Sequence, residues 1–290
     1  MKDPIHFTKE IFLLGIIIQR DRKKRTISLR QHKHIEALLA RFPLTKGYHK
    51  TPISIDVNSL IEDNSVITDQ PYRELIGVLT HIMNVSRPDI AYSLSVFSRF
   101  SCAPRETHWF HLQQVVRYLS HTKHLCLTYG GARYIGKPLD FLAYSDSDYA
   151  TDKQSRKSQA GYCILFLGSS VTWKSRQISS VVQSSCEAEY VIAAITANVI
   201  KGLSQFMAQL ELDIVRPMPL FIDNTSAIIV SHNPSKGSSL KHVDVRYAKI
   251  REYIMSRLIK SMHIPTARQT ADIMTKVLLF ILHHRHTMGL

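Results

Sequence analysis

The stretch Ser-Ser-Cys-Glu-Ala-Glu-Tyr-Val-Ile-Ala, residues 184–193, predicts the start of a long amphipathic helix. Ser184 and Glu187 have the spacing of a capping box, in which each side chain accepts a hydrogen bond from a backbone N–H at the helix start. After Ala188, apolar residues recur at the spacing of a buried helical stripe: Ile192, Ile195, Val199, Leu203, Phe206 and Leu210. Glu189 lies beside this stripe, and the sequence offers no obvious lysine or arginine near it. We therefore expect a half-buried carboxylate that requires a proton or a cation.

The composition indicates a basic globular protein of about two domains. The 290 residues are 44% hydrophobic and 21% charged, with a formal net charge of +14, and the isoelectric point is near 9.7. Such an excess of positive charge attracts polyanions, above all nucleic acid, although basic surfaces also bind acidic proteins and membranes.

Cysteine usage and apolar runs bear on the cellular compartment. The four cysteines have neither metal-ligand spacing nor the density of a disulfide scaffold, which favours a reduced, intracellular protein: Cys102, Cys126, Cys163 and Cys186. The longest apolar runs, residues 11–18 and 277–282, are too short to cross a bilayer, and no signal peptide opens the chain. We expect no membrane partner and a cytoplasmic location, with the nucleus as the alternative.

The first part of the chain, residues 1–130, predicts a β-hairpin followed by helices. Strands at 12–19 and 26–29 flank a charged turn, and a helix at 34–42 precedes Pro43. Beyond a loop at 45–69, apolar periodicity predicts three helices: 72–83, 88–100 and 109–119. Basic residues between the apolar stripes are typical of a solvated face, or alternatively line a groove for a phosphate backbone: Arg99, Arg105, Arg117 and Lys123.

A cluster of glycines and a proline marks a domain boundary. We expect a linker at 131–138, a second domain at 139–280 and a tail at 281–290. The second domain has an α/β pattern, in which strands are predicted at 139–144, 161–168, 171–174, 220–222 and 259–264. Its helices are predicted to begin at Ser184 and to span 243–258 and 270–279.

Four carboxylates of the second domain stand at the ends of these elements. Asp146 and Asp223 follow predicted strands, and Glu189 and Asp272 lie at helix starts. Because open α/β sheets place ligands at the carboxyl ends of strands, the four side chains are expected to converge. Such a cluster needs a positive partner, and oxygen-only ligands select a hard cation such as Mg²⁺. The alternative is that each acid is a solvated group or a helix cap, which is the interpretation for Asp148, Asp152 and Glu187.

Five motifs carry a family resemblance. They are Tyr-Ser-Asp-Ser-Asp-Tyr-Ala (144–150), Ser-Ser-Cys-Glu-Ala-Glu-Tyr (184–190), Ile-Asp-Asn-Thr-Ser-Ala-Ile (222–228), Lys-His-Val-Asp-Val-Arg-Tyr (241–247) and Ala-Asp-Ile-Met-Thr-Lys (271–276). Together they closely resemble the ribonuclease H domain of copia-type retrotransposon Pol polyproteins. Upstream, segments such as Ser-Arg-Pro-Asp-Ile-Ala-Tyr (86–92) and Val-Val-Arg-Tyr-Leu (115–119) resemble the region after the polymerase palm in the same polyproteins.

The resemblance implies an α/β fold whose C-terminal domain is a ribonuclease H-like mixed five-stranded sheet with helices. It implies that Asp146, Glu189, Asp223 and Asp272 are the catalytic and metal-binding residues. They would hold two Mg²⁺ ions, with Mn²⁺ as the alternative, and cut the RNA strand of an RNA–DNA hybrid. Backbone contacts to this substrate are expected from Asn224, Lys241, His242 and Arg246.

The resemblance also implies that residues 1–130 are the end of a reverse transcriptase, with its primer-holding hairpin and helical thumb. The rest of the Pol polyprotein is then a partner, and a virus-like particle is the expected cytoplasmic location. Departures from the family pattern are Tyr149 for Trp, Cys186 for Thr and Ala248 for His. The paired aspartates of the polymerase are absent, so no DNA synthesis is expected from this chain.

Two rival hypotheses remain open on the sequence alone. One is a degenerate relic that binds nucleic acid through its charge without cutting it. The other is a ribonuclease H-like nuclease acting on DNA, such as an integrase or transposase. Those enzymes usually carry a glutamate as their last acid, whereas the last matched acid here is Asp272, which disfavours them.

Overall fold

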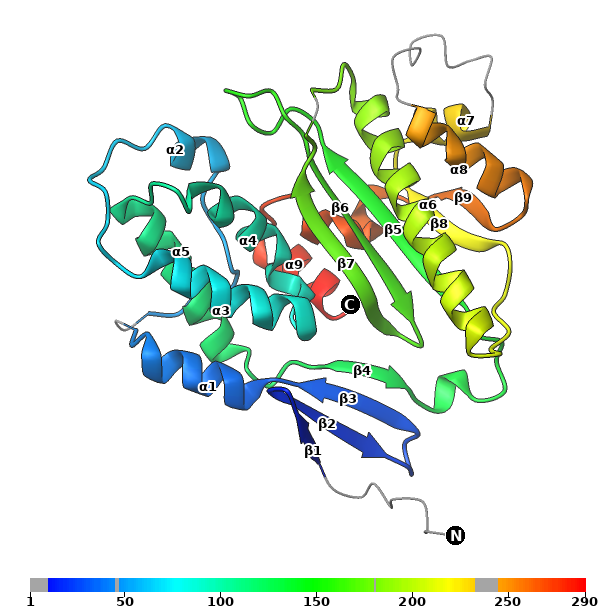
Figure 1. Ribbon diagram of the computed structural model, residues 1–290, viewed down its shortest axis with the longest axis horizontal. Coiled ribbons are helices and arrows are strands. Elements are labelled where there is room, and N and C mark those ends of the chain that lie inside the picture. The colour runs from blue at the N-terminus through cyan, green and yellow to red at the C-terminus, as the bar shows by residue number, and fades with distance from the viewer. Residues whose placement is uncertain (1–9, 45–46, 180, 233–244) are drawn as a thin grey trace. The chain divides into compact units, whose positions relative to one another are not determined.

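The computed structural model describes residues 10–44, 47–179, 181–232 and 245–290, with the side chains of 245–248 left out (Figure 1). Contacts divide the chain into two compact units. Unit 1 comprises Met1–Lys137 together with Val277–Met288 and Leu290, and unit 2 comprises essentially Pro138–Lys276. Each unit has its own hydrophobic core.

Unit 1 contains a four-stranded antiparallel sheet in the order β1-β2-β3-β4. Its strands are β1 (Ile11–Leu13), β2 (Ile16–Asp21), β3 (Thr26–Arg30) and β4 (Leu127–Gly130). The structure differs from the predicted strand at 12–19, because positive φ angles at Leu14 and Gly15 separate β1 from β2. Gly130 has a φ of 88°, and a Cβ atom there would lie 2.6 Å from the Arg25 carbonyl oxygen. This close approach allows β4, which the sequence analysis missed, to pair with β3.

Helices form the rest of unit 1. They are α1 (His32–Arg41), α2 (Val57–Ile61), α3 (Tyr72–Val85), η1 (Pro88–Ile90), α4 (Ala91–Phe97), η2 (Ser98–Phe100), α5 (Glu106–His121), η3 (Ala132–Tyr134) and α9 (Phe280–Thr287). The expected loop at 45–69 contains α2, whose start is capped by the Asp56 carboxylate accepting from the Asn58 N–H. The expected helix at 88–100 is present as three consecutive helical segments.

A buried ion pair joins η1 to α5 inside unit 1. Arg87 is 1% exposed and Asp89 is 3% exposed. The guanidinium donates to both Asp89 carboxylate oxygens, at 2.9 and 2.6 Å, and to the Thr122 carbonyl oxygen at 3.0 Å. The Tyr118 hydroxyl donates to Asp89 Oδ2 at 2.6 Å. Burial opposes the ionisation of Asp89, but the adjacent Arg87 prevails and lowers its pKa. These bonds satisfy both charges, as a buried pair requires.

Unit 2 is built on a mixed sheet in the order β7-β6-β5-β8-β9, which confirms the predicted five-stranded sheet. Its strands are β5 (Phe141–Asp148), β6 (Gln159–Phe166), β7 (Ser169–Gln177), β8 (Met218–Ile222) and β9 (Ile259–His263). Strands β5, β6 and β7 pair antiparallel, whereas β8 is parallel to both β5 and β9. The predicted strand at 139–144 actually continues to Asp148, so that Asp146 lies within β5 rather than beyond it.

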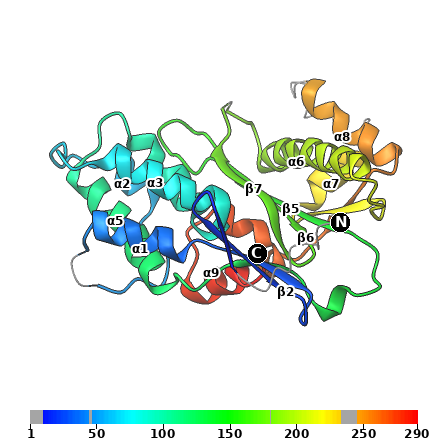
Figure 2. The ribbon, with the colours of Figure 1, turned by 60° about the horizontal axis from the view of Figure 1, so that its bottom comes forward.

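Helix α6 (Ser185–Gln209) runs along one face of this sheet, as Figure 2 shows, and packs against β5, β6 and β8. The Ser184 side chain accepts from the Glu187 N–H at 3.1 Å, as the capping box predicts. Glu187 accepts in return from the N–H of Gln183 at 2.7 Å. The helix is long and apolar enough to pass a test for membrane spans, but half of its most apolar window is buried inside the protein. Core packing accounts for that apolar character.

The remaining helices of unit 2 are α7 (Thr225–His232), α8 (Val245–Met255), η6 (Thr266–Arg268) and η7 (Thr270–Met274). The predicted helix at 270–279 is wrong, because residues 270–274 form the 3₁₀ helix η7, closed by a hydrogen bond from the Thr275 N–H to the Asp272 carbonyl oxygen. Residues 281–290, which the sequence analysis expected to be a tail, also differ from the prediction, because helix α9 packs against η1 as part of unit 1. Periodicity in the sequence does not show where a short apolar segment will find its partner.

Gly161 on β6 allows η7 to lie against the sheet. A Cβ atom at this position would overlap the Cβ of Met274 and lie 3.1 Å from the Lys174 carbonyl oxygen. We expect Gly161→Ala to lower the free energy of unfolding by about 1–3 kcal/mol, because η7 must move away. Urea denaturation measures the change.

Gly202, inside α6, provides the matched control because nothing lies within 4 Å of an added Cβ. Gly202→Ala is expected to raise the free energy of unfolding by about 0.5–1 kcal/mol through helix propensity. Equal stability of the Gly161→Ala variant and the wild type would contradict the close contact with η7.

Candidate metal centre

Asp146 lies on β5, the central strand of the unit 2 sheet, and its side chain is 1% exposed. The strand register places it opposite Gly161, whose open face contacts Met274 of η7. The Thr275 hydroxyl donates a hydrogen bond to Asp146 Oδ2. The sheet thus holds one carboxylate away from water, where the segment at η7 closes over it.

Two further aspartates approach Asp146. Asp223 directly follows β8 and accepts a hydrogen bond from the Thr266 hydroxyl at 3.1 Å. Asp272 lies in η7 and is 6% exposed. One carboxylate oxygen from each of the three aspartates lies within 4.8 Å of the other two. The parallel pairing of β5 with β8 and the docking of η7 therefore gather residues that are far apart in the sequence.

Glu189, the fourth predicted acid, projects from α6 and is 3% exposed. Its Oε1 atom accepts from the backbone N–H of Ser147 at 2.7 Å and from the Ser147 hydroxyl at 2.9 Å. Its Oε2 atom is buried and has no hydrogen-bond partner among the described residues. Glu189 lies outside the set of three aspartates, but the negative charges of Asp146 and Asp223 still act on it.

Burial is the main cause that raises the pKa values of Asp146, Glu189 and Asp272. Repulsion between neighbouring carboxylates adds to this effect, and the pKa of Asp272 reaches about 7. The three groups therefore resist simultaneous ionisation at neutral pH unless a cation is present.

Lys276 is a member of this site that the sequence analysis missed. Its ammonium lies 3.3 Å from Asp146 and 3.1 Å from Asp272. Burial lowers the pKa of Lys276, but the attraction of the two carboxylates is stronger and raises it overall. The sequence contains an indication of this ion pair, because Lys276 lies four residues after Asp272 and is the last residue of the motif 271–276. Lys276 pairs with Asp146 and Asp272 rather than with Glu189, for which the sequence analysis expected a cation or a proton.

The donor atoms fit a hard divalent cation. All the candidate ligands are carboxylate oxygens, the type that Mg²⁺ and Mn²⁺ prefer. The unpartnered Oε2 atom of Glu189 gives the site a further buried acceptor. Asp146, Asp223 and Asp272 are therefore the residues that would hold such an ion, with Glu189 beside them.

Several relatives of the chain are Pol polyproteins of plant transposons, and no family model matches it. The retrovirus-related Pol polyprotein from the Nicotiana tabacum transposon TNT 1-94 is 34% identical over 273 residues, which cover 91% of this chain and 20% of that protein. The corresponding polyprotein from the Arabidopsis thaliana transposon RE1 is 31% identical over 269 residues, which cover 92% and 18%. The chain belongs to the retrotransposon Pol polyprotein family. This Pol segment spans about a fifth of the length of these relatives.

A solved structure is similar to part of the Pol segment. It is the N-terminal ribonuclease H domain of a Mycobacterium tuberculosis protein, with 12% identity and a TM-score of 0.34, covering 47% of this chain and 91% of that chain. Unit 2 has the mixed five-stranded sheet with helices that the motif resemblance to ribonuclease H domains implies.

The predicted substrate contacts of the Pol segment are only partly described. The Asn224 side chain accepts from the Ala227 N–H at 3.0 Å, which makes it a cap of α7. Lys241 and His242 lie outside the described residues, and so does the side chain of Arg246. The role of these four residues in substrate binding stays a prediction.

The raised carboxylate pKa values predict a pH-dependent stability for the metal-free Pol segment. Between its ordinary pKa of 3.8 and the folded value of about 7, folded Asp272 retains a proton that the unfolded chain has lost. Stability from this group therefore falls as pH rises through that interval. A Mg²⁺ ion held here would favour the ionised carboxylates, so we expect Mg²⁺ to raise the unfolding temperature more at pH 8 than at pH 5. Thermal denaturation with and without Mg²⁺ measures this, and Asp272→Asn should flatten the metal-free pH dependence.

Proposed function

We propose that unit 2 is a metal-dependent ribonuclease H that hydrolyses the RNA strand of an RNA–DNA hybrid. The observation that carries this proposal is the set of oxygens from Asp146, Asp223 and Asp272 within 4.8 Å of one another on a ribonuclease H-like sheet. Membership of the Pol family supports a nucleic-acid hybrid as the substrate. The formal net charge of +14 supports the binding of a polyanion.

The proposed chemistry divides between bound ions and the residues of the chain. Two Mg²⁺ ions would lower the pKa of the attacking water and neutralise charge on the leaving 3′ oxygen. Asp146, Asp223 and Asp272 would hold them, and Glu189, whose Oε1 atom is held by Ser147, would add its unpartnered Oε2 atom. Lys276 balances Asp146 and Asp272 and so limits their repulsion. The remainder of the Pol polyprotein is the proposed partner.

Removal of one ligand tests the proposal. Asp223→Asn keeps the size of the side chain but removes its charge. We expect it to lower the rate of Mg²⁺-dependent RNA cleavage in a hybrid by more than about 100-fold, which exceeds the loss typical of residues that only support ligands. The readout is gel separation of fragments from an end-labelled RNA strand. Asp213→Asn, at an exposed position of the same unit, should cleave like the wild type.

A second pair of variants separates the metal-site role of Glu189 from a structural one. Glu189→Gln should lose cleavage, whereas Glu187→Gln, two residues earlier on α6, should cleave like the wild type, because the glutamine amide oxygen can still accept the capping bond from Gln183. Cleavage at the wild-type rate by Asp223→Asn or Glu189→Gln would refute the assignment. If the wild-type chain binds the hybrid in a salt-dependent manner but never cuts it, the degenerate relic is the correct description.

A further inference from the structure

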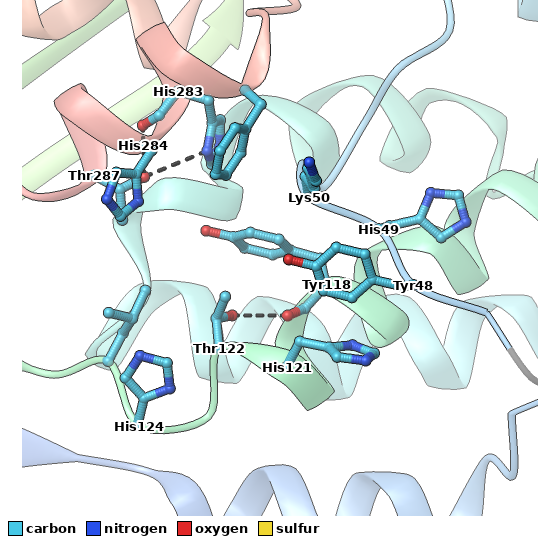
Figure 3. Close-up of a pocket in the computed structure, with 12 residues that line it drawn as sticks. Tyr48, His49, Lys50, Tyr118, His121, Thr122, His124, His283, His284 and Thr287 are labelled. Atoms are coloured by element: carbon cyan, nitrogen blue, oxygen red, sulfur yellow. Dashed lines mark hydrogen bonds between the residues drawn. The ribbon is translucent and has the colours of Figure 1, made fainter.

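Unit 1 contains a pocket that the nuclease proposal does not use. Its volume is about 280 Å³. Residues 48–50, the end of α5 with the turn after it, and α9 form its walls. Figure 3 shows the rings of Tyr48 and Tyr118 between the histidines of α9 and His121 of α5. All the lining residues belong to unit 1, so the pocket is complete within that unit.

The floor of this pocket is fixed by the buried ion pair of unit 1. Asp89 accepts the hydroxyl of Tyr118, and Arg87 binds both the hydroxyl and the carbonyl oxygen of Thr122. The ring of His283 meets that of Tyr118 edge-on, with 5.5 Å between their centroids. Tyr118 and Thr122 are thereby held in one arrangement. The motif 86–92, which the nuclease site leaves unexplained, therefore supplies the hydrogen-bond partners of two lining residues, Tyr118 and Thr122.

The mouth of the pocket carries exposed rings and a cation. Tyr48 is 59% exposed and packs edge-on against His121, with 4.6 Å between centroids. The Lys50 ammonium lies over the Phe280 ring, 5.1 Å from its centroid. Five of the twelve lining residues are histidines and none is an aspartate or a glutamate. The pocket therefore offers aromatic faces, N–H donors and positive charge without any competing carboxylate.

Two ligand classes are conceivable for a pocket rich in histidine. A metal ion needs three or more ligand atoms close together, and among the described residues only the aspartates of unit 2 form such a group. A planar, anionic ligand instead uses ring faces for stacking and Lys50 for its charge. The volume lies near the lower end of the range for small-molecule sites, which suits one nucleotide.

We propose that this pocket binds a single nucleotide, with its base against the aromatic rings and its phosphate near Lys50. The nucleotide is either free in solution or the terminal residue of a strand, since both present the same base and phosphate. This pocket shares no residue with the acidic cluster of unit 2, so the proposal does not depend on whether unit 2 cleaves RNA.

Calorimetric titration of the full chain with AMP tests the proposal, with adenosine and inorganic phosphate as partial ligands. AMP should bind more tightly than either part, because only AMP uses both the rings and Lys50. Tyr48→Ala and Lys50→Met should each weaken AMP binding by about tenfold or more. Both residues are exposed, so the fold should tolerate the changes. Lys33→Met is the matched control, because Lys33 also lies over a ring of unit 1, that of Phe12, but outside the pocket.

The source of the nucleotide follows from a second titration, with a 5′-phosphorylated tetranucleotide. Tighter binding than AMP supports a strand end, and equal or weaker binding supports a free nucleotide. The proposal is overturned if AMP fails to bind at concentrations up to about 10 mM, or if inorganic phosphate binds as tightly as AMP. It is equally overturned if Lys33→Met weakens binding as much as Lys50→Met. AMP affinity must also survive Asp223→Asn, since a loss there would place the binding in unit 2.

Discussion

The cost of burying several carboxylates close together is the constraint on which the acidic site of unit 2 depends. Asp146, Glu189 and Asp272 are almost completely removed from water, and burial with mutual repulsion raises the pKa of each. Hydrogen bonds and one ion pair offset part of the free-energy cost of burying these charges. Thr275 donates to Asp146, Thr266 to Asp223 and Ser147 to Glu189, and the Lys276 ammonium pairs with Asp146. Four carboxylates against one ammonium still leave three negative charges without a partner if all of them ionise. A divalent cation, as the proposed function requires, is the partner that such oxygen ligands would select.

The backbone brings these acids together through two features of different kinds. One is the parallel pairing of β5 with β8, which sets Asp223 beside the strand that carries Asp146. The other is the absence of a side chain at Gly161, which lets η7 approach the sheet and deliver Asp272 and Lys276 together. A regular helix at 270–279 would have continued past the sheet. The tight 3₁₀ turn instead ends the segment at the site, and the chain then returns to unit 1 as α9.

The parts of this arrangement that the sequence predicts are those encoded by local pattern. The capping box and apolar stripe of α6, the strands of unit 2 and the four acids all follow from spacing, turn residues or motifs. The parts it misses depend on contacts between distant segments. The ion pairs of Lys276, the pairing of β4 with β3 and the packing of α9 on η1 leave little or no local signature. Asp146 shows the limit within one element, because polar residues suggested a strand end where β5 continues to Asp148.

Charge is balanced in opposite ways in the two units. In unit 1 two hydrogen bonds join Arg87 to Asp89, and three more join the pair to Thr122 and Tyr118, so that both charges are satisfied without a ligand. The pair fixes the position of Tyr118. The pocket around Tyr118 is lined by hydrogen-bond donors and contains no aspartate or glutamate. In unit 2 the excess of carboxylates creates a need for cations. A nuclease must hold a polyanion and also concentrate divalent ions against it. Under the proposed function, the net charge of +14 would attract the strand, and the acidic cluster found among the described residues would hold the metal where the strand is cut.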